Sequence, residues 1–170
     1  SVTRPVGVPS LRKVLPAERV VGKRAPSTSA TERGLPQNTS GFIWPVNGIL
    51  LSKFGSLGKG LQNDGINIQA RRGTPVRSIQ KGVVAYSGNE LRGFGNLLLV
   101  KHGGGWISAY AHNEKLLVRI GQRVRRGQII SYVGSTGSVD RPQLHFELRR
   151  QNRAVNPERY LGRRTAYLTR

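Results

Sequence analysis

The sequence contains neither cysteine nor methionine among its 170 residues. Without cysteine, disulfide bonds and thiolate-ligated metal sites are excluded, although no cellular compartment is. Because methionine is absent, residue 1 is not a translation start, which leaves room for a removed signal peptide, lipid anchor or upstream domain. No apolar run approaches the roughly 20 residues that cross a bilayer, so we expect no membrane span in this chain.

Acidic residues are also scarce. Asp and Glu number 8 against 28 Lys and Arg, and the formal net charge is +20 at pH 7. Such a field attracts polyanions, which include nucleic acid, anionic polymers of a bacterial envelope and acidic protein surfaces. The sequence shows no helix-turn-helix, no aromatic RNA-binding pattern and no zinc finger, so we expect no specific nucleic-acid partner.

Apolar residues are few in the first forty positions, where Pro, Ser, Thr, Arg and Lys dominate. This composition favours an extended or unstructured chain. We therefore predict a basic arm or linker over residues 1–40, one domain over 41–162 and a basic tail over 163–170. Two roles for the arm stay open: it lies across a groove of the domain and occludes it, or it links the domain to another.

Long amphipathic helical patterns are missing from the predicted domain as well. Short runs rich in Val, Ile, Leu and aromatic residues alternate with glycine-bearing turns, which predicts an all-β domain. Three glycines at 103–105 predict a hairpin between two of these runs. One helical turn is expected at 113–117, capped by Asn113. The expected strands are 49–54, 74–78, 83–87, 96–102, 106–112, 128–133 and 143–149.

Polar residues in three short motifs have the spacing of a metal site with some ligands exchanged. A catalytic zinc ion needs three protein ligands and an open position for water. A His-x-x-x-Asp pair on one strand supplies two ligands from the same face, and a His-x-His pair adds a ligand and a base. In this sequence the corresponding residues are Asn63 and Asn67, which we expect on one strand over 63–68, then Gln143 and His145. His112 ends a Tyr-Ala-His run between them.

From residue 42 to residue 161, the sequence resembles the LytM/lysostaphin-type zinc metallopeptidases, which cut peptide cross-links in bacterial cell walls. The residues that carry the resemblance are Trp44-Pro45-Val46, Gly65-Ile66-Asn67-Ile68, Gly73-Thr74-Pro75-Val76, Gly82-Val83-Val84, Gly95-Asn96, Lys101-His102, Tyr110-Ala111-His112, Gly121, Val124, Gly127-Gln128, Gly134-Ser135-Thr136-Gly137, Leu144-His145-Phe146-Glu147 and Asn156-Pro157. The resemblance implies an antiparallel β-sheet sandwich with a groove. It places the zinc ligands of active members on Asn63, Asn67 and His145, and their catalytic histidines on His112 and Gln143.

Only His112 and His145 keep the side chain that active members have at these positions. The neutral amide oxygens of Asn63 and Asn67 are poor zinc donors, and Gln143 accepts no proton near neutral pH. Asp64 is one residue out of phase and is expected to face away from the site. We therefore expect no catalysis, no zinc and no other cofactor.

Residues 86–96 and 108–113 are most similar to the catalytically degenerate NlpD/EnvC/DipM-type branch of the family. That resemblance implies a periplasmic protein. Some proteins of this kind are anchored to the outer membrane, which here would require an N-terminal segment that has been removed. Such proteins bind and activate an N-acetylmuramoyl-L-alanine amidase that supports separation of daughter cells. Arginines suit a partner groove because their planar fork pairs with carboxylates. The expected groove residues are Asn63, Asn67, Arg71, Arg72, Arg92, His112, Arg141, Gln143 and His145.

Two other functions stay open: a module that binds peptidoglycan without activating anything, and an active zinc endopeptidase. The remaining conspicuous side chains have simpler interpretations. His102 is expected to be a structural histidine at the end of a strand, and Trp44 and Trp106 are expected to pack against the core.

Overall fold

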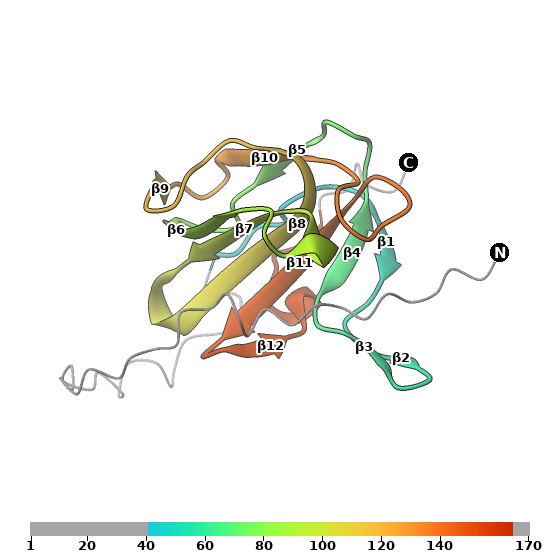
Figure 1. Cartoon of the computed structure of the whole chain (residues 1–170). Coiled ribbons are helices and arrows are strands. Elements are labelled where there is room, and N and C mark those ends of the chain that lie inside the picture. The colour runs from blue at the N-terminus through green and yellow to red at the C-terminus, as the bar shows by residue number, and fades with distance from the viewer. Residues whose placement is uncertain (1–40, 165–170) are drawn as a thin grey trace, which may run out of the picture.

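The computed structural model describes residues 41–164 (Figure 1). This part of the chain forms twelve β-strands and three short 3-10 helices, with no α-helix. Its elements are β1 Ile49–Ser52, β2 Gly55–Gly58, β3 Leu61–Asn63, β4 Ile66–Gln69, β5 Pro75–Arg77, β6 Gly82–Gly88, η3 Arg92–Phe94, β7 Asn96–Lys101, η4 Gly103–Gly105, β8 Trp106–Leu116, β9 Arg123–Val124, β10 Ile129–Val133, β11 Gln143–Arg150, β12 Arg153–Val155 and η5 Pro157–Arg159.

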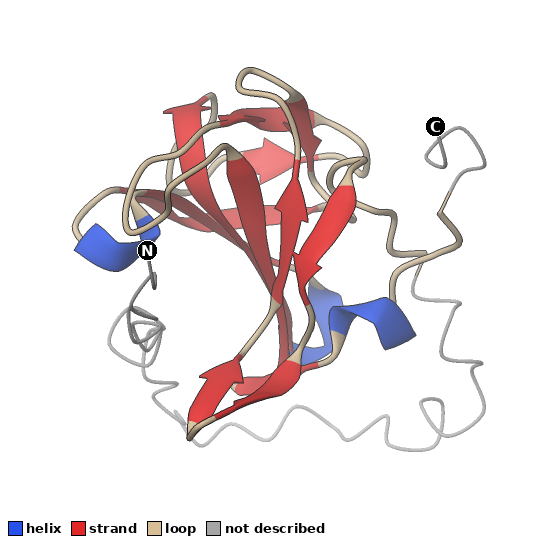
Figure 2. Ribbon diagram, turned by 90° about the vertical axis from the view of Figure 1, so that its right-hand side faces the viewer, coloured by secondary structure: helices blue, strands red, loops and turns tan. Residues whose placement is uncertain are grey.

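Ten of these strands join one antiparallel sheet in which β1 and β9 are the two ends of the order β1-β4-β11-β8-β7-β6-β9. The far end of β8 pairs with β10, and β10 pairs with β5, so the sheet curls over itself (Figure 2). β12 pairs antiparallel with the end of β11, while β2 and β3 form a separate hairpin. The predicted all-β antiparallel fold is therefore confirmed.

The main hydrophobic core lies inside this curl, and strand alternation decides which residues enter it. On β7, Leu98 and Val100 belong to the main core, whereas Leu97 and Leu99 belong to a second apolar cluster. The curled-over strands contribute to the main core as well, through Ile130 on β10. The central strands are apolar on both faces because both faces are covered.

The predicted glycine hairpin is present: β7 and β8 pair from Lys101 and Ile107 onward, joined by η4. Gly104 has φ of 72°, a left-handed conformation that glycine adopts without steric penalty. Each of the other expected strands is also found, shifted by one or two residues at its ends.

The expected helical turn at 113–117 is wrong, because β8 continues through this segment to Leu116. Asn113 is fully buried and does not cap a helix. Its side-chain amide donates to the carbonyl oxygens of Asn96 and Tyr110, both at 2.8 Å, and accepts from Ser131 Oγ at 2.7 Å. A tertiary hydrogen-bond network therefore overrides the local capping tendency.

The expected single strand over 63–68 is also wrong. β3 ends at Asn63 and β4 begins at Ile66, with a bend at Asp64 and Gly65. Asn63 Oδ1 accepts a hydrogen bond from the Gly65 backbone N–H at 3.0 Å. Asparagine stabilises turns through this local side-chain bond, which competes with strand pairing.

The predicted arm at 1–40 lies outside the described residues, as does most of the predicted tail at 163–170, so both stay predictions. Within residues 41–164, no helix is long and apolar enough to cross a membrane.

Candidate functional site

Four of the five positions expected to correspond to the family's ligands and catalytic residues meet where β4 lies beside β11. The register places Asn67 opposite His145, and Gln69 opposite Gln143. Asn63, at the end of β3, reaches the same place because the bend after it turns the chain back. Its side chain is buried and its Nδ2 donates to Ser52 Oγ at 2.9 Å.

These side chains form one connected hydrogen-bond network, which we call the carboxamide network (Asn63, Asn67, Gln143 and His145). Asn67 Oδ1 accepts from Asn63 Nδ2 and from His145 Nδ1, each at 3.0 Å. Asn67 Nδ2 donates to Gln143 Oε1 at 2.9 Å, and Gln143 Nε2 donates to the Arg141 carbonyl oxygen at 3.2 Å. Each amide therefore has a partner of the complementary kind.

The network sets the tautomer of His145. Because a carboxamide oxygen can only accept, His145 Nδ1 must carry the proton in its bond to Asn67 Oδ1. A protonated ring nitrogen has no lone pair for a cation. The resemblance noted in the sequence implies a zinc ion here, and the donor set does not fit one, since two neutral amides and this nitrogen offer zinc no strong ligand.

No group of three or more His, Cys, Asp or Glu side chains with metal-site geometry occurs within residues 41–164. Asp64, the nearest carboxylate in sequence, does not enter the network. Its Oδ2 lies 3.8 Å from Arg149, and its Oδ1 accepts from Gln62 at 3.4 Å. Asp64 lies in the bend between β3 and β4, so the expectation from strand alternation that it faces away from the site does not apply to it.

His112, the fifth position, lies beside the network without joining it. Its ring centroid is 6.1 Å from that of His145. Its Nδ1 donates to the Thr136 carbonyl oxygen at 2.8 Å, and its φ of 67° is unusual for a non-glycine residue. Burial and, to a smaller extent, the nearby His145 lower the pKa of His112 to about 4, against the opposing effect of the Thr136 hydrogen bond. His112 is thus a neutral, fixed side chain near neutral pH.

Sequence reasoning missed a row of buried charged residues that continues from His145 along β11. Glu147 Oε1 lies 3.1 Å from Arg149, and Glu147 Oε2 lies 3.5 Å from His145 Nε2. All three side chains are buried on the same face, because residues two apart on a strand project together. The Gln-x-His-x-Glu-x-Arg alternation of 143–149 was the signal in the sequence.

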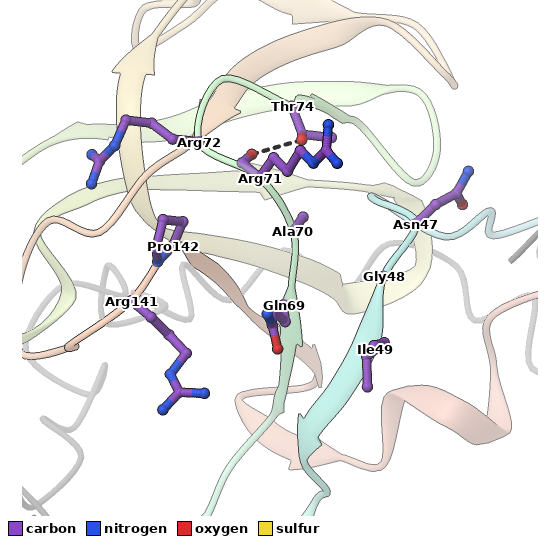
Figure 3. Close-up of a pocket in the computed structure, with 10 residues that line it drawn as sticks. All are labelled: Asn47, Gly48, Ile49, Gln69, Ala70, Arg71, Arg72, Thr74, Arg141 and Pro142. Carbon is purple, nitrogen blue, oxygen red and sulfur yellow. Dashed lines mark hydrogen bonds between the residues drawn. The ribbon is translucent and has the colours of Figure 1, made fainter. Parts of the chain in front are cut away.

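Next to the network is a shallow depression of about 630 Å³, which we call the arginine depression (Figure 3). It lies along the start of β1 and the end of β4, and the loop before β11 closes one side of it. Its lining residues are Asn47, Gly48, Ile49, Gln69, Ala70, Arg71, Arg72, Thr74, Arg141 and Pro142.

Three of the four predicted groove arginines line this depression. Arg72 is held by Glu114 at 2.6 Å and by Ser135, and Arg141 lies 3.4 Å from Asp140. Arg71 has no ion-pair partner within residues 41–164, and its backbone carbonyl accepts from Thr74 Oγ1 at 2.6 Å. Arg92 is different: it begins η3, is exposed, and does not line the depression.

The side chains expected to be structural have structural partners. His102 Nδ1 donates to the Lys81 carbonyl oxygen at 2.7 Å, and its Nε2 lies 2.8 Å from Ser108 Oγ. Trp106 packs edge-on against Phe42 and Tyr160. Trp44 also packs against the main core, so these three expectations are confirmed.

Comparison with known proteins gives strong matches of sequence. Cell division protein DipM of Caulobacter vibrioides is 51% identical over 108 residues, which cover 64% of this chain and 18% of that protein. A lipoprotein NlpD/LppB homolog of Pseudomonas aeruginosa is 46% identical over 139 residues, which cover 82% of this chain and 46% of that protein. Murein hydrolase activator NlpD of Escherichia coli is 44% identical over 125 residues, which cover 74% of this chain and 32% of that protein. The chain spans less than half the length of each of these relatives.

Solved structures agree. The catalytic domain of the antimicrobial peptidase lysostaphin from Staphylococcus simulans superposes with a TM-score of 0.59 at 30% identity, covering 65% of this chain and 89% of that one. A zinc-containing peptidase from Vibrio cholerae superposes with a TM-score of 0.63 at 32% identity, covering 68% of this chain and 39% of that one. The resemblance seen in the sequence is confirmed, and residues 61–157 match the profile of peptidase family M23, so this chain belongs to that family.

Proposed function

We propose that this chain is a non-catalytic regulator of a cell-wall hydrolase, built on the fold of a family of peptidases. The observation that carries the proposal is the hydrogen bond from His145 Nδ1 to Asn67 Oδ1 within the carboxamide network. A zinc peptidase needs ligand atoms that are free to bind metal, and a base that can accept a proton. In this network the amides bind one another. Gln143, which the sequence resemblance aligns with a catalytic histidine, has no basic nitrogen that accepts a proton.

The names of the relatives support regulation of the cell wall. One relative is named as a murein hydrolase activator and another as a cell division protein. Two more carry the word lipoprotein in their names, which supports a place in the bacterial envelope. We infer for this chain a periplasmic location, with anchoring to the outer membrane outside the described domain.

We infer that the partner is an N-acetylmuramoyl-L-alanine amidase and that the arginine depression contributes to its binding. The Arg72 and Arg141 side chains are about half exposed, as are their acidic neighbours. Exposed ion pairs of this kind contribute about 0–1 kcal/mol, so a partner's carboxylates can replace them at little cost. Arg71 has no ion pair among the described residues, so it can bind a partner's carboxylate without breaking one.

The buried network serves this surface as a rigid support. Because its members are satisfied by one another, the strands β4 and β11 stay in register beneath the exposed arginines. Activation follows as a shift of population: the chain binds the amidase better when an inhibitory segment of the amidase has left the amidase's own active site. Differential affinity for the two states is sufficient, and no reaction at this chain's site is required.

The test is release of label from dye-labelled sacculi by a purified amidase, with and without this chain. We expect the chain alone to release nothing and the mixture to release more than the amidase alone. Unchanged release, together with no binding in a pull-down, would overturn the proposal. Elemental analysis of the purified chain tests the metal separately, with less than stoichiometric zinc expected.

A second candidate is a module that binds peptidoglycan and activates nothing, and the net charge of +20 favours it. Sacculi carry free carboxylates, so binding of this kind weakens steeply as salt rises. Cosedimentation with sacculi over a salt series separates the candidates, because a saturable amidase complex that survives high salt supports the activator. An active zinc endopeptidase requires both bound zinc and turnover of muropeptides.

A further inference from the structure

At the β9 end of the sheet there is a second depression, of about 620 Å³, which we call the lysine depression. It is built from the start of β6, the end of β7 and the short strand β9. Its lining residues are Lys81, Gly82, Val83, Lys101, His102, Gly103, Arg123 and Val124. None of these residues belongs to the carboxamide network or to the arginine depression.

Three cations line the lysine depression, and no acidic residue within 41–164 pairs with them. Lys81, Lys101 and Arg123 are exposed, and none forms an ion pair with a carboxylate within residues 41–164. The one other titratable side chain of the lining, His102, has both ring nitrogens engaged. The depression therefore presents positive charge that its own neighbours leave uncompensated, which suits an anionic ligand.

Exposed aliphatic side chains lie in the depression and in the turn that precedes β9. Val83, in the depression itself, is 41% exposed, and Ile120, at the tip of the turn that precedes β9, is 64% exposed. Hydrogen bonds hold this turn in place: Gln122 N–H donates to the Arg119 carbonyl oxygen at 3.1 Å, and Gly121 N–H donates to that of Val84 at 2.8 Å. The Ile120 side chain is thus presented to solvent from a fixed loop beside β6.

The surface made by the lysine depression and the Ile120 turn lies at the opposite end of the sheet order from the arginine depression. β9 ends that order on one side and β1 on the other, as Figure 1 shows at the left and right of the domain. A ligand at the β9 end therefore leaves the β1 end open to a protein partner.

We propose that this surface docks onto a membrane rich in anionic phospholipid, with lipid phosphates bound by Lys81, Lys101 and Arg123. Basic residues close to an anionic bilayer are each attracted to it, and neighbouring aliphatic side chains enter the boundary between headgroups and acyl chains. A nucleic acid or a wall polymer accounts for the cations alone. The exposed Val83 in the depression and the exposed Ile120 in the turn before β9 favour lipid. This contact goes beyond the regulation of a hydrolase and does not depend on it.

The test is cosedimentation of the full chain with vesicles of phosphatidylcholine alone, and with vesicles of equal parts phosphatidylcholine and phosphatidylglycerol. We expect binding only to the second kind. The double variant Lys101→Glu with Arg123→Glu should lower the partition coefficient by about tenfold or more, since it reverses two cations at the contact. Ile120→Ser should lower it several-fold with no change of charge.

A matched control reverses two exposed cations elsewhere, Lys53→Glu with Arg153→Glu, and should retain most of the binding. Equal loss in this control would overturn the proposal, because the attraction would then come from net charge alone. Binding that is indifferent to Ile120→Ser would also overturn it. The lipid proposal is also overturned, in favour of a wall polymer as ligand, if Ile120→Ser still cosediments with sacculi while Lys101→Glu with Arg123→Glu does not. Circular dichroism of each variant confirms that the fold is kept.

Discussion

Asn67 and His145 face each other across β4 and β11, and the amide oxygen of Asn67 accepts a hydrogen bond from His145 Nδ1 at 3.0 Å. In a zinc peptidase a carboxylate and an imidazole would both turn their lone pairs to a metal ion. A carboxylate could accept the same hydrogen bond, but only an amide at position 67 can also donate one, from Nδ2 to Gln143 Oε1, so the network is closed without a cation. The same two strands thus hold a closed network in place of an open coordination site.

Restoring the ligands should therefore restore the metal. Asn63→His combined with Asn67→Asp gives the site two imidazoles and a carboxylate, which is a complete set for catalytic zinc. We expect this double variant to hold about one zinc ion per chain after dialysis, measured by elemental analysis. Asn63→His alone should hold much less. Stoichiometric zinc in the unaltered chain would contradict the prediction.

Removing the buried amide of Asn113 should destabilise the domain. The variant Asn113→Ala leaves the carbonyl oxygens of Asn96 and Tyr110 and the hydroxyl of Ser131 without this partner. Unsatisfied buried groups cost about 1–3 kcal/mol each, and we expect a loss of about 2–4 kcal/mol in the free energy of unfolding by urea. Lys115→Ala, exposed on the same strand, serves as the control and should change it by less than about 0.5 kcal/mol.

Stability should fall as pH falls from about 6.5 to about 4. His112 has a pKa of about 4 in the folded state and an ordinary value of 6.5. In this window the unfolded chain binds a proton that the folded chain does not, so protonation favours unfolding. The loss from this residue is about 3 kcal/mol, present in full below pH 4 and absent above pH 6.5.

Urea unfolding at a series of pH values measures this loss. His112→Asn is the matched variant, because asparagine tolerates the left-handed backbone at this position and does not titrate. Its stability should depend less steeply on pH than that of the unaltered chain. Identical slopes for the two proteins would show that another group controls acid sensitivity.

The arginine depression should be needed for the proposed activation. Arg71→Glu combined with Arg141→Glu reverses two exposed charges and should weaken amidase binding by about tenfold or more. Calorimetric titration and release from labelled sacculi measure binding and activation. The control Arg125→Glu with Arg153→Glu carries the same change of net charge at exposed positions outside the depression. Equal effects of the two double variants would show that net charge acts, without a specific surface.

Much of the fold was predictable from local patterns. Short apolar runs bounded by glycine turns indicate where β6, β7, β8 and β11 lie, because such runs are visible in the sequence. Two short strands were missed: β9 has two residues and β12 has three, each begins with an arginine, and neither forms an apolar run. The helical turn predicted after His112 failed because Asn113 is bonded to residues that are distant along the chain.

The sequence by itself determined that neutral amides stand at positions 63, 67 and 143, and donor chemistry is a property of residue type. Only the tertiary structure decided how those amides are used. Strand register brings Asn67 opposite His145, a bend returns Asn63 to the same place, and the exposed cations separate to the two ends of one sheet. These relations join residues up to 78 positions apart, and such contacts depend on the pairing of whole strands and leave no local pattern.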